Sequence, residues 1–239
     1  MNIVVTIKQV VDPNLPPSYI NLDATGKRIV SPFGVAPVMN GYDANALEAA
    51  LKLREAHGGR VTAVCLGDDT ARATVTRALA MGADAATLLN DPDWLNLDSA
   101  GVGQVLAAAI RKTGPFDLVL CGRQASDTDG GQVLYWIAEA LGLSAVCPIS
   151  KIESVADGDL LLHRPSNLEH VDVLFYNDMD IGRHVAIFHV NSHALGGSTP
   201  TKNSAYAPRA IAHSGDAGNG QRGKSDYRSQ HSWGDPYGT

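Results

Sequence analysis

The chain has 239 residues, a formal net charge of −6, 44% hydrophobic residues and 18% charged residues. This composition is typical of a folded protein, and the length suits one or two domains. The negative charge argues against a nucleic-acid surface, which needs clustered Lys and Arg. The chain contains no apolar run of 18 residues and does not begin with a signal-peptide pattern, so we expect a cytoplasmic protein without a membrane span.

Three cysteines lie in or beside apolar runs, Cys65, Cys121 and Cys147. Their odd number and wide spacing fit neither a disulfide framework nor a zinc site, so we expect reduced thiols. Three histidines fall close together, at His184, His189 and His193, but they lack the spacing of a metalloprotease helix. We therefore predict no metal ligands. No G-x-S-x-G sequence follows a strand, so serine hydrolase chemistry has no support either.

Hydrophobic patterning predicts four alternations of strand and helix. The strands are expected at 2–7, 60–66, 85–89 and 116–121. The first helix is expected to be capped by Asp43 and to end at Gly58, and the later ones to end at Gly82, Lys112 and Leu141. A proline-rich excursion over 11–39 is expected to contain a hairpin near 23–26.

This alternation predicts an α/β fold: a parallel sheet with helices on both faces, in three layers. Ligands of such sheets bind beyond the carboxyl ends of the strands, at a switch point in the strand order. The ligand-facing loops are therefore expected after Ile7, Leu66, Leu89 and Cys121.

The loop after the fourth strand carries the most information. An apolar strand at Leu118–Cys121 ends at Gly122, and a polar loop with Gly130 and Gly131 leads into a helix that begins near Gln132. A helix N-terminus favours phosphate, and glycines allow close approach and positive φ. The loop is neither a P-loop nor the dinucleotide G-x-G-x-x-G. Taken alone, it leaves both a nucleotide site and a simple capped turn open.

Several stretches, in order and with the expected spacing, resemble the β subunit of electron transfer flavoprotein and its nitrogen-fixation-associated relatives. They are the stretches 1–13, 38–55, 61–67, 77–84, 124–133 and 137–142. The resemblance covers about the first 160 residues. It implies a fold like that of the adenine-nucleotide α-hydrolases and an electron carrier rather than a catalyst with its own substrate. It also implies a heterodimer with an α subunit that holds FAD, and flavin dehydrogenases as electron donors.

The same resemblance implies that this subunit holds AMP or a second FAD. On general grounds an asparagine at position 40 is a satisfied turn or cap residue. The resemblance implies instead that Asn40 contacts the nucleotide. Thr6, Cys65 and Leu66 are expected to contribute through their backbone. The complete set of predicted contacts is Thr6, Asn40, Cys65, Leu66, Gly122, Gln124, Asp127, Thr128, Asp129, Gly130, Gly131, Gln132, Val133 and Leu134.

Beyond residue 150 the pattern changes. A strand pair is expected over 150–163, with further strands possible at 171–175 and 184–190. After Asn191 the chain is polar and glycine-rich. We therefore expect a nucleotide-binding domain over residues 1–190 and a disordered or aberrant tail over 191–239.

The resemblance ends at Arg164. The family's Leu-Pro-Ala-Val-Val type strand, its Pro-Arg-Tyr type recognition loop and its partner-wrapping arm are not found after this residue. A shifted reading frame, a fragment or true divergence would each produce this change. The alternative function is a stand-alone adenine-nucleotide module like the universal stress proteins. The residues Lys8–Val10 together with Asn40 oppose that alternative.

Overall fold

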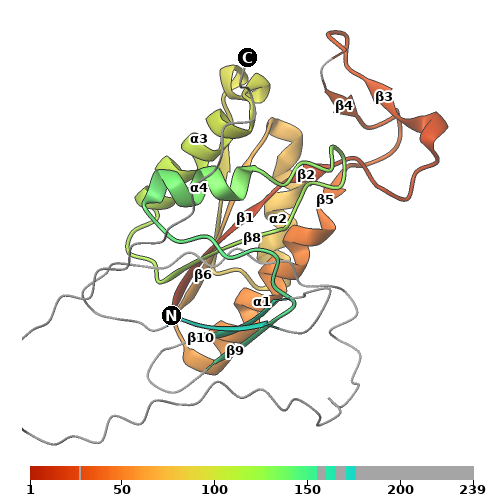
Figure 1. The fold of residues 1–239 in the computed structure, drawn as a ribbon. Coiled ribbons are helices and arrows are strands. Elements are labelled where there is room, and N and C mark those ends of the chain that lie inside the picture. Colours follow the sequence, from red (N-terminus) through yellow and green to blue (C-terminus); the bar gives the residue numbers. More distant parts are fainter. Residues whose placement is uncertain (27, 155–159, 165–170, 176–239) are drawn as a thin grey trace, which may run out of the picture. The chain divides into compact units, whose positions relative to one another are not determined.

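The computed structural model describes residues 1–26, 28–154, 160–164 and 171–175. The chain separates into two compact units, Met1–Gly197 and Ser198–Thr239. The second unit, the possible strand at 184–190, the histidines at 184, 189 and 193 and the expected tail over 191–239 lie outside the described residues. Everything below concerns the first unit (Figure 1).

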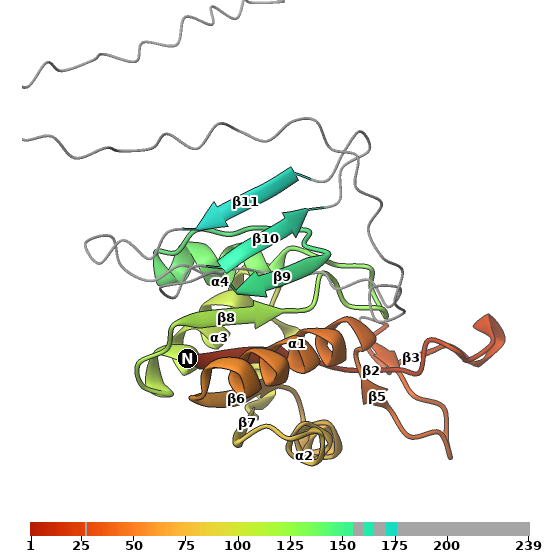
Figure 2. The same ribbon diagram turned by 90° about the horizontal axis from the view of Figure 1, so that it is seen from below.

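Four parallel strands form the central sheet, in the order β7-β6-β1-β8. Their bounds are β1 Asn2–Ile7, β6 Arg60–Leu66, β7 Ala85–Leu89 and β8 Leu118–Cys121. The chain runs outward from β1 to β6 and β7 and then returns to β8 on the other side of β1 (Figure 2). The order therefore reverses between β1 and β8, and this is the switch point where a crevice opens.

Helices cover both faces of this sheet, as predicted. They are α1 Gly41–His57, α2 Arg72–Met81, α3 Ser99–Lys112 and α4 Val133–Leu141. Alternate residues of β1 point to opposite faces: Ile3 and Val5 pack with α1 and α2, whereas Val4 packs with α3 and α4. Both apolar clusters are nearly inaccessible to water, which accounts for the near-continuous hydrophobic composition of the strands.

The excursion before α1 carries two small antiparallel ladders. β2 (Gln9–Val10) pairs with β5 (Val38–Met39), and β3 (Asn21–Leu22) pairs with β4 (Ile29–Val30). The β3–β4 hairpin turns at 23–26, as expected, with Gly26 at φ +69°. Four large apolar side chains of the excursion are exposed, Tyr19, Ile20, Leu22 and Phe33.

The predicted strand pair near residue 150 is also present. β9 (Lys151–Ser154), β10 (Leu160–Arg164) and β11 (Val171–Phe175) form a separate antiparallel sheet. Leu162 of β10 packs into the same apolar cluster as α1. None of the described helices combines the length and apolar character needed to cross a bilayer.

One predicted boundary is wrong in an informative way. Helix α1 begins at Gly41 with Asn40 at the cap position, so Asp43 lies inside the first turn rather than capping it. The carboxylate of Asp43 instead accepts the backbone N–H groups of Lys8 and Gly122, which directly follow β1 and β8. The sequence-based expectation failed because an aspartate near a helix start is normally a local cap.

Candidate functional site

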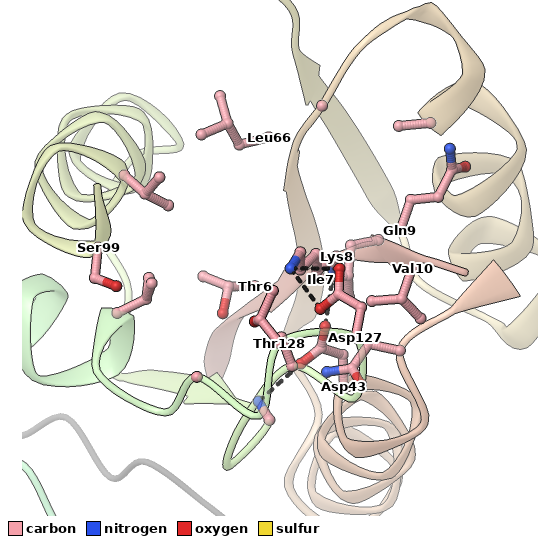
Figure 3. Close-up of a pocket in the computed structure, with 18 of the residues that line it drawn as sticks. Thr6, Ile7, Lys8, Gln9, Val10, Asp43, Leu66, Ser99, Asp127 and Thr128 are labelled. Carbon is pink, nitrogen blue, oxygen red and sulfur yellow. Dashed lines mark hydrogen bonds and ion pairs between the residues drawn. The ribbon is translucent and has the colours of Figure 1, made fainter. Parts of the chain in front are cut away.

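A cavity of about 760 Å³ lies beyond the carboxyl ends of the central strands. Its size is that of small-molecule sites, about 300–1,000 Å³. All four loops expected to face a ligand contribute to it, together with the segment 28–31 at strand β4. Figure 3 shows part of the lining, including Thr6, Leu66 and Ser99. The lining segments are 6–11, 28–31, 66–68, 70–71, 94–99, 121–125, 127–128, 130–131 and 133–134, with Pro37, Asn40, Asp43, Val102 and Leu106.

Asp43 joins the two strands that flank the switch point. Its Oδ2 accepts the N–H of Lys8 at 2.7 Å, and its Oδ1 accepts the N–H of Gly122 at 3.1 Å. Lys8 and Gly122 each directly follow a strand, β1 and β8. One carboxylate therefore satisfies the two backbone donors at the point where the segments after β1 and β8 diverge.

Burial raises the pKa of Asp43 to about 7. The side chain is only 6% exposed, and removal from water penalises its charged form. The N–H of Lys8, the side chain of Asn40, the N–H of Gly122 and the charge of Lys8 act in the opposite direction. Desolvation is the larger effect, so this carboxyl group changes its charge near neutral pH.

Asn40 connects the start of α1 to the loop after β8. Its Nδ2 donates to the carbonyl oxygen of Gln124 at 2.8 Å, and its Oδ1 accepts the N–H of Ser126 at 3.3 Å. Its own N–H donates to the carbonyl oxygen of Lys8 at 2.9 Å. The side chain is 1% exposed. Asn40 lines the cavity, and both ends of its amide hold the loop.

The loop after β8 is closed by its own backbone, since the N–H of Ala125 donates to the carbonyl oxygen of Gly130 at 2.9 Å. Gly130 and Gly131 tolerate positive φ, but in the described loop the residue that has it is Asp129, at +55°. Aspartate is one of the few other residues that tolerate this region. Gly131 is needed for a different reason: a Cβ there would lie 2.9 Å from the carbonyl oxygen of Arg123.

Gly122 makes the closest approach in the site. A Cβ at this position would lie 2.1 Å from Oδ1 of Asp43 and 2.8 Å from its backbone nitrogen. The start of α1 therefore packs directly against the end of β8. Only glycine allows this contact without a backbone shift.

Lys8 and Asp127 form an ion pair within the cavity. The Lys8 Nζ lies 2.7 Å and 2.9 Å from the two carboxylate oxygens of Asp127. The lysine side chain is 43% exposed and the aspartate side chain 12%. Figure 3 shows the two side chains facing each other between the end of β1 and the loop.

The N-termini of α3 and α4 both lie beside the cavity, and they differ in their caps. Asp98 caps α3, because its side chain accepts the N–H of Gly101 at 2.8 Å. Gln132 occupies the corresponding position before α4, and within the described chain its side chain makes no capping hydrogen bond. Of these two helices, α4 is the one whose positive end has no side-chain acceptor at its cap position.

Most of the predicted contact residues line the cavity: Thr6, Asn40, Leu66, Gly122, Gln124, Asp127, Thr128, Gly130, Gly131, Val133 and Leu134. Asp129 and Gln132 belong to the same loop but are exposed outside the lining. Cys65 is not among the lining residues, and its side chain is fully buried in the core against α1 and α2.

Sequence reasoning did not assign roles to Lys8, Arg123 or the lining segments 28–31 and 94–99. A charged residue directly after a buried strand was the available signal for Lys8. The segment 94–99 belongs to the loop after Leu89, which was expected to face a ligand. The segment 28–31 carries no comparable signal, since the fold alone brings it to the cavity.

The two thiols beside the site are poor nucleophiles. Burial raises the pKa of both Cys65 and Cys121 to about 12, so they stay protonated at neutral pH. The described residues contain no cluster of three or more His, Cys, Asp or Glu placed to hold a metal ion.

Strand order, helix layers and cavity position define the chain as a doubly wound α/β protein with its cavity at the switch point. The family model for the electron transfer flavoprotein domain matches residues 30–171, which is more than half of the chain. The chain therefore belongs to the electron transfer flavoprotein family, as the resemblance to its β subunits implied.

Individual relatives agree with this assignment. The electron transfer flavoprotein subunit beta of Thermoanaerobacterium thermosaccharolyticum is 41% identical over 162 residues, 68% of this chain and 59% of that protein. Protein FixA of Azorhizobium caulinodans is 40% identical over 159 residues, 65% of this chain and 55% of its own. The caffeyl-CoA reductase-Etf complex subunit CarD of Acetobacterium woodii is 39% identical over 166 residues, 69% and 61%. The chain thus spans little more than half the length of these relatives.

Proposed function

We propose that the cavity binds an adenine nucleotide, AMP or FAD, with its phosphate at the loop 126–134. The observation that carries this proposal is the N-terminus of α4, which lies at the cavity without a side-chain cap while α3 beside it is capped by Asp98. Backbone N–H groups at such a position attract phosphate. Location at the switch point and a volume suited to a small molecule support the same assignment.

We further infer that the protein acts as the β subunit of an electron carrier. In this role it pairs with an α subunit that bears the redox-active FAD and receives electrons from flavin dehydrogenases. The flavin supplies the redox chemistry, and the protein supplies binding and orientation. Family membership and the subunit names of the relatives support this inference.

The nucleotide site is tested by Gly131→Val. A Cβ at 131 meets the Arg123 carbonyl oxygen at 2.9 Å, so a branched side chain displaces the loop from its hydrogen-bonded position. Calorimetry should show AMP and FAD affinity weaker by at least about tenfold, or about 1.4 kcal/mol. Ala80→Val, which adds a similar side chain at an exposed position of α2, is the matched control. Unchanged affinity in folded Gly131→Val protein would show that the loop does not bind the nucleotide.

Co-expression with a family α subunit distinguishes the β-subunit role from the alternative, a stand-alone nucleotide-binding module without redox function. The β-subunit role requires a 1:1 complex with a flavin absorption spectrum that a flavin dehydrogenase reduces. A protein that binds AMP but never associates with an α subunit fits the alternative. Because the family's recognition loop and partner-wrapping arm are not found after Arg164, we expect this 1:1 complex to form with lower affinity than that of the relatives.

A further inference from the structure

The charges around the cavity do not by themselves favour an anionic ligand. The described lining holds three basic residues, Lys8, Arg28 and Arg123, and four acidic ones, Asp43, Asp68, Asp98 and Asp127. A phosphate group entering this space needs a particular cation placed close to it, because the summed charge does not attract it.

The three basic residues differ in how they are held. The Arg28 Nε lies 3.4 Å from Oδ2 of Asp23, outside the lining, and the Arg123 side chain is exposed on the loop. Lys8 directly follows β1 at the switch point. Its N–H is bound by Asp43 at 2.7 Å and its carbonyl oxygen by the N–H of Asn40 at 2.9 Å. The Lys8 side chain therefore starts from a backbone fixed on both sides.

Asp127 positions the ammonium without using all its donors. The two Nζ–oxygen distances, 2.7 Å and 2.9 Å, both lead to one carboxylate. An ammonium has three N–H donors, and the lysine side chain is 43% exposed against 12% for the aspartate. Lys8 therefore retains at least one donor for an acceptor that enters the cavity.

We propose that Lys8 is the residue that selects a phosphate-bearing ligand, and that Asp127 holds its ammonium in the cavity until the ligand arrives. This proposal rests on the proposed nucleotide site. An ammonium is a compact point charge well suited to phosphate, and charge-assisted hydrogen bonds are the stronger ones. Since Asp127 competes with the phosphate for the same cation, the two residues act on phosphate binding in opposite directions.

The test compares AMP with adenosine, which lacks the phosphate. Dissociation constants for both are measured by calorimetry on the full chain at one ionic strength, for the wild type, Lys8→Met, Lys8→Arg and Asp127→Asn. The control is Lys52→Met, which removes the same charge from a lysine that pairs with Glu48 on α1, outside the cavity lining. Circular dichroism and thermal melting verify that each variant is folded.

Lys8→Met should weaken AMP binding by about 10-fold to 100-fold, the range for a hydrogen bond to a charged group. Its adenosine affinity should change by less than about threefold, which is within the effect of an ordinary surface substitution. Lys8→Arg keeps the charge and should retain the preference for AMP. Asp127→Asn should strengthen AMP binding, and Lys52→Met should leave both affinities unchanged.

Equal loss of AMP and adenosine affinity in Lys8→Met would show that the lysine only supports the loop, and it would overturn the proposal. So would an unchanged AMP affinity, or weaker AMP binding in Asp127→Asn. Failure of the nucleotide site itself is distinguishable, because the wild-type protein would then bind neither AMP, FAD nor adenosine.

Discussion

The two ends of the central sheet use the same interaction for different purposes. At the amino end, Asp117 accepts the N–H of Asn2 at 2.6 Å and Asp84 accepts the N–H of Val61 at 2.8 Å. At the carboxyl end, Asp43 accepts two such N–H groups. At both ends a carboxylate satisfies backbone donors in the first residues of a strand or directly after its end. The carboxyl end lies beside the cavity.

The environment of the carboxylates separates the two ends. The Asp84 side chain is 38% exposed, and the N–H of Val61, aided by Arg54 at 3.0 Å, lowers its pKa. The Asp43 side chain is 6% exposed, and burial raises its pKa to about 7. The same kind of hydrogen bond, from a backbone N–H to a carboxylate, thus accompanies opposite pKa shifts in Asp84 and Asp43. Hydration, rather than the bond, decides whether such an aspartate stays charged.

The largest expected effect is the pH dependence of stability. Native Asp43 keeps its proton up to about pH 7, whereas the unfolded chain releases it near pH 4, so the free energy of unfolding should fall as pH rises between these values. Asp43→Asn does not titrate. The free energy of unfolding of the wild type minus that of the variant, measured by urea titration, should therefore fall by roughly 4 kcal/mol at most between about pH 4 and pH 7. Above about pH 7 this difference should stay constant.

Asp84→Asn is the matched comparison from the amino end. The lowered pKa of Asp84 contributes stability above about pH 4, and this stability is lost as the pH falls. The free energy of unfolding of the wild type minus that of Asp84→Asn should therefore rise with pH, whereas the difference for Asp43 falls. Curves with the same slope for the two aspartates would contradict the contrast between a buried and an exposed carboxylate.

The next effect concerns Gly122. In Gly122→Ala the new Cβ meets Asp43 at 2.1 Å and 2.8 Å, including its backbone, so α1 and β8 must separate. We expect the free energy of unfolding to fall by about 3 kcal/mol, together with weaker ligand binding. In the control Gly41→Ala, no described atom lies within 4 Å of the new Cβ apart from those of its chain neighbours and of its own helix backbone. Its stability should be unchanged or slightly higher in the same urea titration.

The smallest effect compares two asparagines, one at each end. Asn40→Asp places a carboxylate oxygen against the carbonyl oxygen of Gln124 in a buried site. The free energy of unfolding should therefore fall by about 2 kcal/mol. Asn2→Asp replaces an exposed donor, 3.5 Å from the carbonyl oxygen of Pro115, and should cost less than about 0.5 kcal/mol. Thermal or urea unfolding of the pair measures the difference; equal costs would mean that Asn40 does not hold the loop.

Local pattern alone was enough to predict most elements of this fold. The strands β1, β6, β7 and β8, the hairpin near Gly26 and the β9–β10 pair were all expected from hydrophobic spacing and turn residues. These features depend on neighbours within a few residues, so the sequence expresses them directly. The position of the cavity followed as well, because parallel strands bring their carboxyl ends to one edge.

The contacts that build the site were decided only by tertiary structure. Asp43 was expected to cap its own helix, yet its acceptor oxygens serve residues 35 and 79 positions away. The Lys8–Asp127 pair joins residues 119 positions apart. The need for glycine at 122 arises from α1 packing against β8. Such contacts depend on the strand order β7-β6-β1-β8, which local periodicity does not specify, because each strand carries the same apolar pattern whichever neighbour it pairs with.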